Sequence, residues 1–360
     1  MASHFLRAGT LSRWGVASNI PPVSLLSTAH LEASLWDQRV DALGLRVEAS
    51  PIFALVEQVH AELAAAGIAF RPAYCVSNEW GCPDLVPLVG IPFFLVDPRF
   101  HALEEEHADD LEDAARILAG IRHEVGHALN YAFRLYLEVE WTGVFGDFFA
   151  DYDDDYRPLP FAAGYVRHLP GWYSQKHPDE DFAETFALWL TPGSNWRERY
   201  ATQPRALAKL EYVDRAMHRI GTLAPEVDPA QAETDPDELA FTVREYYTTR
   251  ATEDAGPVDE LGPWLDDDLR VIFSADGIGT DAEGILLARR RTIMNSVSTF
   301  TGARLYVVKA LIDAVAARLH TLGLRALPGR EIDAVTEVTA LVAALVANFV
   351  QTGHFRHTSA

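Results

Sequence analysis

Residues 50–100 show the patterns of one helix followed by two strands. Apolar residues recur at the helical period in SPIFALVEQVHAELAAAG, residues 50–67, and the closing glycine is a typical helix stop. The next stretch, IAFRPAYCVS at 68–77, predicts a strand. VPLVGIPFFLVDPRF at 86–100 is rich in β-branched and aromatic residues and predicts a second strand. Because Pro92 has no amide hydrogen for a central ladder, we expect an edge strand to which an extended peptide can add.

The middle of the chain predicts three helices around a long irregular connection. Residues 104–137 begin with acids suited to a helix N-terminus and continue with apolar residues at helical spacing. Residues 138–178 have no sustained period and many aromatic residues, Pro and Gly. A connection of this length is uncommon in a compact domain unless it has a role. Helices are predicted again at 177–190, where Pro178 suits a first turn, and at 204–221.

The pattern changes twice more towards the C-terminus. Residues 224–268 contain fourteen Asp or Glu, two Arg and several Pro, which is typical of an acidic connector. Helical spacing returns beyond Gly284. We therefore expect an α+β protein with a first domain that contains a small mixed sheet, followed by a mainly α-helical domain. The expected boundaries are an N-terminal extension at 1–49, the first domain at 50–223, the connector at 224–283 and the helical domain at 284–360.

Composition supports two packed units and limits the classes of partner. The chain has 360 residues, of which 49% are hydrophobic, enough for more than one core. Its formal net charge of −22 argues against nucleic-acid and anionic-membrane partners, because Lys and Arg must neutralise the phosphates of such partners. The sequence does not determine the oligomeric state.

Two segments bear on localisation. The apolar run at 338–350 stops at Gln351, short of the ~20 residues that span a bilayer, and predicts a buried helix. Residues 1–31 carry Arg7 and Arg13 and no acid, but the two prolines in SNIPPVSLL break any long amphipathic helix. We expect a flexible start and a cytoplasmic protein, with no membrane partner.

The two cysteines, Cys75 and Cys82, have six residues between them. This spacing fits neither a zinc knuckle nor a disulfide-stapled secreted domain. Reduced thiols are the favoured interpretation, and one local disulfide remains open.

The predicted helix at 104–137 carries a candidate metal site in IRHEVGHALNYAF, residues 121–133. Positions four apart lie on one face of a helix, so His123 and His127 could reach one metal ion while Glu124 faces a water molecule beside it. Ordinary core packing is the alternative for two histidines at this spacing.

A third donor has to come from another element, because a zinc hydrolase needs three protein ligands and an open fourth position. Glu180 and Glu184 stand four apart among the apolar residues of EDFAETFALWL, residues 180–190. Two carboxylates near apolar surroundings need compensation, which a metal and a metal-bound histidine supply. The spacing alone does not order the two, and a solvated charge or an ordinary salt bridge stays open for Glu184.

HEVGH together with YSQKHPDEDFAETFA, residues 173–187, resembles the gluzincin metallopeptidases, in particular the lethal-factor-like and Pro-Pro-endopeptidase-like branch. The upstream stretch at 79–100 is similar to the edge-strand region of bacterial zinc-binding metallopeptidases. The resemblance covers roughly residues 50–220 and implies a zincin-like catalytic domain. It implies that Glu180 is the third zinc ligand, that Glu184 supports a zinc histidine, and that Tyr173 is the oxyanion donor.

The implied function is zinc-dependent hydrolysis of peptide bonds. Zinc activates a water molecule, Glu124 acts as general base and Tyr173 donates to the developing oxyanion. An ordinary packing role is the alternative for Tyr173, and His168 or His177 are alternative donors. The rival functions are a regulatory or binding protein with a zinc site and little turnover, and a zinc amidase that acts on a non-peptide amide. A peptide or protein substrate is the expected partner.

Two charged features remain open. Asp151, Asp153, Asp154 and Asp155 could bind calcium or form a solvated acidic loop. Residues 284–360 contain nine Lys or Arg and four Asp or Glu, whereas the rest of the chain is strongly acidic. We therefore expect the C-terminal helices to dock on the catalytic domain and to shape its cleft.

Overall fold

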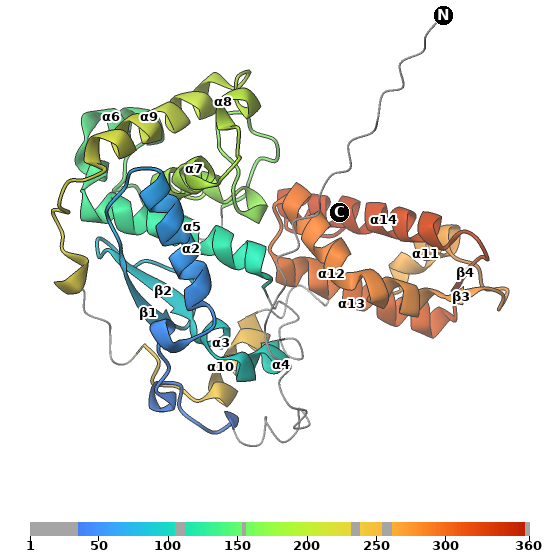
Figure 1. Cartoon of the computed structure of the whole chain (residues 1–360). Coiled ribbons are helices and arrows are strands. Elements are labelled where there is room, and N and C mark those ends of the chain that lie inside the picture. The colour runs from blue at the N-terminus through green and yellow to red at the C-terminus, as the bar shows by residue number, and fades with distance from the viewer. Residues whose placement is uncertain (1–34, 105–111, 153–155, 232–237, 254–260, 357–360) are drawn as a thin grey trace, which may run out of the picture.

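The computed structural model describes residues 35–104, 112–152, 156–231, 238–253 and 261–356 (Figure 1). Helices dominate, and the described strands form two small sheets of two strands each. The expected α+β class is therefore confirmed. The start at 1–31, for which we expected flexibility, lies outside the described residues, as do Asp153, Asp154 and Asp155 of the acidic loop.

The first sheet follows helix α2 (Phe53–Ala65) and pairs β1 (Ala73–Ser77) in parallel with β2 (Leu88–Pro92). Every residue of β2 is buried. These elements confirm the predicted helix and the positions of two strands, but the predicted length of the second strand is wrong. Phe93–Val96 forms the short helix α3, because Pro92 ends the ladder and the following apolar side chains pack into the core.

The expectation of a free edge along β2 is also wrong at its centre. The backbone N–H of Gly90 donates to the carbonyl of Gly81 at 2.8 Å, so the returning chain covers that position. A peptide therefore finds no open ladder there.

Two long helices cross at the centre of the N-terminal part of the structure. Helix α5 (Ala114–Ala132) lies within the predicted 104–137 helix and carries HEVGH, and α7 (Pro178–Leu190) is the predicted 177–190 helix. They approach closely at Gly126, where an added Cβ would lie 3.0 Å from Cα of Ala183. Helix α9 (Pro204–Ile220) packs on α7.

The connection expected to be irregular, residues 138–178, contains helix α6 (Val139–Phe145) and the 3-10 turn η6 (Pro170–Gln175). The remaining short helices are η1 (Asp41–Leu43), η2 (Val47–Ala49), η3 (Pro98–Phe100), α4 (His101–Leu103), η5 (Leu135–Leu137), α8 (Trp196–Arg199), η7 (Pro229–Gln231) and η9 (Pro263–Leu265).

Apolar packing in the N-terminal part of the structure includes residues from outside the expected 50–223 range. Leu35 and Val40 from the expected extension join its core, as do Val243 and Tyr247 from the expected connector. The latter two belong to α10 (Val243–Glu253), a helix within the segment that the sequence pattern assigned to a connector. Its core contact follows from buried Val243, from Tyr247, which stacks on Trp36, and from Tyr246, which contacts Phe93 of α3.

The C-terminal helices surround a second core. They are α11 (Asp266–Ile272), α12 (Ala282–Thr301), α13 (Leu305–Leu322) and α14 (Glu331–Thr352), with β3 (Thr280–Asp281) antiparallel to β4 (Arg325–Ala326). This core begins at Leu265, within the expected connector.

Helix α14 contains the apolar run 338–350. Among the described residues it is the helix whose length and mean hydropathy of 1.6 would allow it to cross a membrane. In the structure it packs on α11, α12 and α13, and the prediction of a buried helix holds for the face formed by Ala334, Val338, Val342 and Val346.

The C-terminal bundle meets the N-terminal part of the structure at η6. Figure 1 shows the bundle to the right of that part, beside one end of α5. Arg167 Nη2 donates to the carbonyl of Thr299 at 2.7 Å, and Arg157 Nη1 donates to that of Gln351 at 3.2 Å. The bundle thus contacts the N-terminal part of the structure through the segment that leads to Tyr173.

Candidate metal centre

The structure brings together the three side chains that the sequence singles out as metal ligands. His123 Nε2 and His127 Nε2 lie 3.1 Å apart, and Glu180 Oε2 lies 2.9 Å from the first and 3.2 Å from the second. All three residues are buried, and they are the group of described residues with the geometry to hold a metal ion. The i,i+4 spacing on α5 and the first turn of α7 produce this convergence.

The other ring nitrogen of each histidine is already engaged. His123 Nδ1 lies 3.1 Å from Glu184 Oε1, and His127 Nδ1 lies 2.7 Å from Asp179 Oδ2. A carboxylate accepts, so each Nδ1 carries its proton and each Nε2 offers a lone pair. Two lone pairs and a carboxylate oxygen then face one point, an arrangement that requires a cation or an extra proton between them. The donor set therefore fits a divalent metal ion.

Glu184 links His123 to the backbone of residues 168 and 169, which precede Tyr173 in the chain. Its fully buried carboxylate accepts from the backbone N–H groups of His168 at 2.9 Å and Leu169 at 3.0 Å, as well as from His123. Glu184 therefore lies outside the group of His123, His127 and Glu180. Its hydrogen bonds hold His123 and the backbone of residues 168 and 169 in place. A solvated charge is excluded as its role by this burial.

Asp179 is the residue that sequence reasoning missed. It accepts from His127 Nδ1, from Asn130 Nδ2 at 2.7 Å and from the hydroxyl of Tyr131 at 2.5 Å. The signal was present in the sequence: Asn130 and Tyr131 follow His127 by three and four positions, so they share its helical face. His177 caps α7, the helix that carries Asp179, by accepting from the backbone N–H of Asp179.

The pKa values of the two histidines and the pKa of Glu180 are shifted in opposite directions. Burial alone would lower the pKa of His123, but hydrogen bonds to Glu180 and Glu184 outweigh it and raise that pKa to about 9. Burial likewise opposes the charges of Asp179 and Glu180 at His127, whose pKa is raised well above its usual value. For Glu180, burial is outweighed by the two histidines, and its pKa lies well below the usual range. The two imidazoles therefore bind a proton more tightly than a free imidazole does, and Glu180 favours its charged form.

Glu124 stands beside the ligand group without belonging to it. Its carboxyl lines the cavity next to His123 and His127. Burial raises its pKa, and the two histidines partly offset that effect. Glu124 is not part of the group of described residues that could hold a metal ion.

Two tyrosines reach the site from the long connection. Tyr173 lies on η6 with its ring centroid 5.6 Å from that of His123, and burial followed by the charge of Glu180 raises its pKa far above the usual value. Tyr152 was not predicted. Its hydroxyl donates to Glu180 and its ring stacks on His177 at 4.6 Å. The ammonium of Lys176 lies over both tyrosine rings, at 4.6 and 5.5 Å.

The two histidines considered as alternative donors have structural partners. His168 Nε2 lies 3.1 Å from the carbonyl of Ala119, and His177 Nε2 lies 3.1 Å from that of Ala150. Tyr173 is therefore the better placed donor of the three. Cys82 lines the cavity by the site, and both Cys82 and Cys75 are free thiols in the structure.

Two cavities adjoin the ligand group on different sides. One of about 500 Å³ lies against Asp151, Tyr152 and the loop around Asp84. The other, of about 690 Å³, lies between η6 and the α12–α13 turn. Both are lined by Trp80, His123, Glu124 and Tyr173. Asp151 is exposed at a cavity rim, which leaves calcium binding by the acidic loop an untested prediction.

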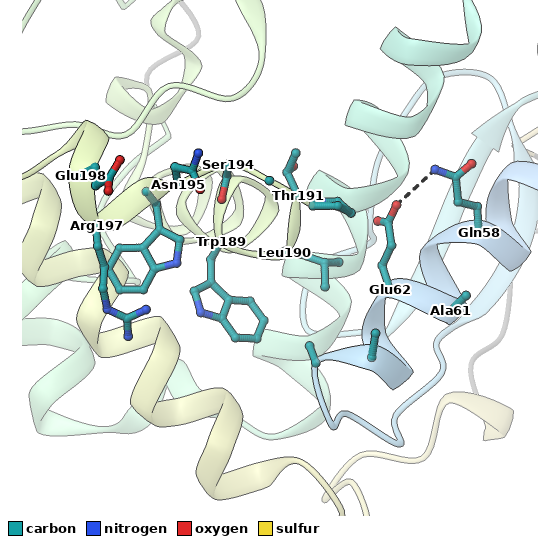
Figure 2. Close-up of a pocket in the computed structure, with 15 residues that line it drawn as sticks. Gln58, Ala61, Glu62, Trp189, Leu190, Thr191, Ser194, Asn195, Arg197 and Glu198 are labelled. Atoms are coloured by element: carbon teal, nitrogen blue, oxygen red, sulfur yellow. Dashed lines mark hydrogen bonds between the residues drawn. The ribbon is translucent and has the colours of Figure 1, made fainter. Parts of the chain in front are cut away.

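A further hollow of about 720 Å³ lies away from these residues, between α2 and the chain after α7 (Figure 2). Of its two acids, Glu62 and Glu198, Glu62 is paired with Arg122 at 2.7 Å and accepts from Gln58 at 3.2 Å. The group of described residues that could hold a metal ion lies elsewhere, so this hollow does not compete as the candidate site.

Comparison of the chain with protein-family models, with curated proteins and with solved structures finds no match. The case for a function therefore rests on the geometry of the site and on the resemblance of its motifs.

Proposed function

We propose that this chain is a zincin-like, zinc-dependent metallopeptidase. The observation that carries the proposal is the convergence of two imidazole Nε2 atoms and one carboxylate oxygen within 3.2 Å, while both Nδ1 atoms are held by other carboxylates. Such outer carboxylates fix the tautomer and orientation of metal-binding histidines.

The donor set favours zinc over other divalent ions. Two imidazoles and one carboxylate are typical of catalytic zinc, whereas calcium and magnesium prefer all-oxygen ligands. His123, His127 and Glu180 would hold the ion, and Glu184 and Asp179 would orient the two histidines. When bound there, zinc supplies Lewis-acid polarisation of the substrate carbonyl and lowers the pKa of a water molecule.

Glu124 is the proposed general base. It takes a proton from the attacking water and passes it to the nitrogen of the leaving amine. Its burial supports this role, because the resulting rise in pKa makes the carboxylate a stronger proton acceptor. A site that only binds metal has no use for a carboxylate in this position.

Tyr173 is the proposed donor to the oxyanion. The raised pKa of its hydroxyl keeps it protonated near neutral pH, so it can donate when negative charge develops on the carbonyl oxygen. Tyr152 lies on the other side of Glu180 and is a second hydroxyl that the site can use.

The two cavities support a peptide as substrate. An extended chain can occupy both sides of a cleaved bond, because the cavities of about 500 and 690 Å³ share Glu124, His123 and Tyr173. A small amide would need only one of them. The geometry therefore favours a peptidase over an amidase for small non-peptide amides.

The test is cleavage of a diverse peptide pool by the zinc-loaded protein, with the cut sites identified by mass spectrometry. Glu124→Gln serves as the control, because it should keep zinc and lose activity by about 10²- to 10⁴-fold. Cuts that depend on Glu124 support the proposal. Zinc-loaded protein that makes no cut contradicts it and favours the regulatory or amidase alternatives.

A further inference from the structure

The turn that carries Tyr173 has a backbone that must be held from outside. Gly171 and Trp172 are both left-handed, with φ of 89° and 60°. For a residue with a side chain, such as Trp172, this conformation costs about 1–2 kcal/mol. It persists where the surrounding structure fixes it. The surroundings of Trp172 therefore decide where the next residue, Tyr173, points.

Those surroundings belong in part to the C-terminal bundle. The guanidinium of Arg167 lies 3.7 Å above the ring of Trp172 and donates to the carbonyl of Thr299, in the last turn of α12. Gly302, which follows α12 in a left-handed conformation with φ of 79°, leaves no room for a side chain beside the same ring. A Cβ at Gly302 would lie 3.0 Å from Cδ1 of Trp172 and 2.7 Å from Cγ of Pro158.

The same stretch of the bundle also reaches the substrate side. Gly302, Ala303 and Leu305 line the 690 Å³ cavity together with Tyr173 and Glu124. A ligand that fills this cavity would touch both parts of the molecule. Packing and cavity lining are separate observations, and both involve the α12–α13 turn.

We propose that the end of α12 fixes the position of Tyr173. Gly302, which follows α12, and Arg167, which binds the last turn of α12, are positioning residues that hold Tyr173 in place through Trp172. The inference rests on the proposed function of Tyr173.

The fold supplies a matched pair of glycines for the test. Gly323 follows α13 as Gly302 follows α12, and it is also left-handed, with φ of 61°. No atom of the described residues lies within 4 Å of a Cβ built on Gly323. Replacement by Ala costs about 1–2 kcal/mol of backbone energy at both positions, but only Gly302→Ala pushes on Trp172.

The first readout is hydrogen exchange of residues 166–176 in the full chain, which needs neither metal nor substrate. We expect Gly302→Ala to increase deuterium uptake there and Gly323→Ala to leave it unchanged. Arg167→Met is the second variant, and it should act in the same direction because it removes the hydrogen bond to Thr299. Equal uptake in the Gly302 and Gly323 variants, with no change in Arg167→Met, would overturn the inference.

The second readout is a double-mutant cycle with Tyr173→Phe on the zinc-loaded enzyme. Gly302→Ala should lower kcat at least tenfold with zinc content and KM little changed, and should change kcat less than twofold when Tyr173 is already Phe. An equal effect in both backgrounds would mean that Gly302 acts on stability alone. If the wild-type chain cuts no peptide, the proposed function and this kinetic role fail together, while exchange still decides whether the bundle holds the turn.

Discussion

Asp179 illustrates how much of the site depends on a residue outside the expected ligand set. Its carboxylate accepts from His127, Asn130 and Tyr131, and all three residues are buried. Losing such an orienting carboxylate typically weakens metal binding 10- to 100-fold. We expect Asp179→Ala to show this loss in competition with a chelator, and to lower the free energy of unfolding by about 1–3 kcal/mol because buried donors lose their acceptor.

The control for Asp179→Ala is Asp84→Ala. Asp84 lines the same cavity but is exposed, so its removal changes the charge of the cavity without removing the hydrogen bond to His127. If both variants weaken zinc binding equally, net charge rather than orientation is responsible, and the role given to Asp179 is wrong.

The two tyrosines at the site differ in what their loss should change. Tyr173→Phe removes the proposed oxyanion donor, so we expect a drop in kcat of about 10²- to 10³-fold with zinc content unchanged. Tyr152 is more exposed and lies on the acidic loop, so Tyr152→Phe should lower kcat less than tenfold. Steady-state kinetics on both variants decides the assignment. The opposite order would identify Tyr152 as the donor.

At this scale the sequence predicts residues that are related by helical spacing. His123 with His127, and Glu180 with Glu184, can be found because i and i+4 share a helix face. Which glutamate faces the histidine Nε2 atoms is not a matter of spacing, and the resemblance supplied that order. Tyr152 could not be predicted, since it lies in a stretch without period, and its position depends on tertiary packing against His177.

The crossing of α5 and α7 is the element-scale feature on which the site depends. A Cβ at Gly126 would lie 3.0 Å from Cα of Ala183 and 3.1 Å from Cδ1 of Phe186. We expect Gly126→Ala to lower the free energy of unfolding by about 1–3 kcal/mol, because the helices must separate. The displaced α5 should also weaken zinc binding. Urea unfolding of the metal-free protein and chelator competition measure the two effects.

Gly143 provides the matched control within another helix, α6. It is exposed, and a Cβ added to it would have no atom of the described residues within 4 Å, so Gly143→Ala should stabilise by about 0.5–1 kcal/mol through helix propensity. A stabilising Gly126→Ala would mean that the two helices do not pack as closely as described.

Elements were predicted well where one period runs for several turns, and less well where a single residue ends a pattern. The helices of residues 50–67, 177–190 and 204–221 satisfy the first condition. The strand at 86–100 does not, because its apolar composition continues beyond Pro92 while the ladder stops there. Apolar residues alone cannot distinguish a buried strand from a short buried helix.

For the whole molecule, the sequence indicated two units but not which segments pack in each. Composition marks 224–268 as acidic, yet the apolar face of α10 belongs to the hydrophobic core around α5 and α7. The carboxylate of Glu104 is fully buried. It accepts from the hydroxyl of Tyr247 at 2.8 Å and forms an ion pair with Arg250 at 3.1 Å. These contacts join segments more than a hundred residues apart, which no local pattern reveals.

This packing determines where the chain can be shortened. A chain that ends at residue 223 loses α10, and with it Tyr247 and Arg250, two of the partners of Glu104. Its free energy of unfolding should therefore be lower by about 3–5 kcal/mol. A chain that ends at residue 260 keeps α10, and should bind zinc but turn over more slowly because the end of α12 is absent. Circular dichroism on urea titration, zinc analysis and kinetics compare the two. Equal stability of both chains would contradict the role of α10.

The central claim is that His123, His127 and Glu180 hold one zinc ion. Its most direct test is elemental analysis of the protein purified without added metal, alongside Glu180→Ala and Glu184→Ala. We predict about one zinc per chain in the wild type, loss of tight binding in Glu180→Ala, and a weaker but occupied site in Glu184→Ala. Absence of any transition metal from the wild type, even after reconstitution, would contradict the account, and retention of zinc in Glu180→Ala with loss in Glu184→Ala would reverse the ligand assignment.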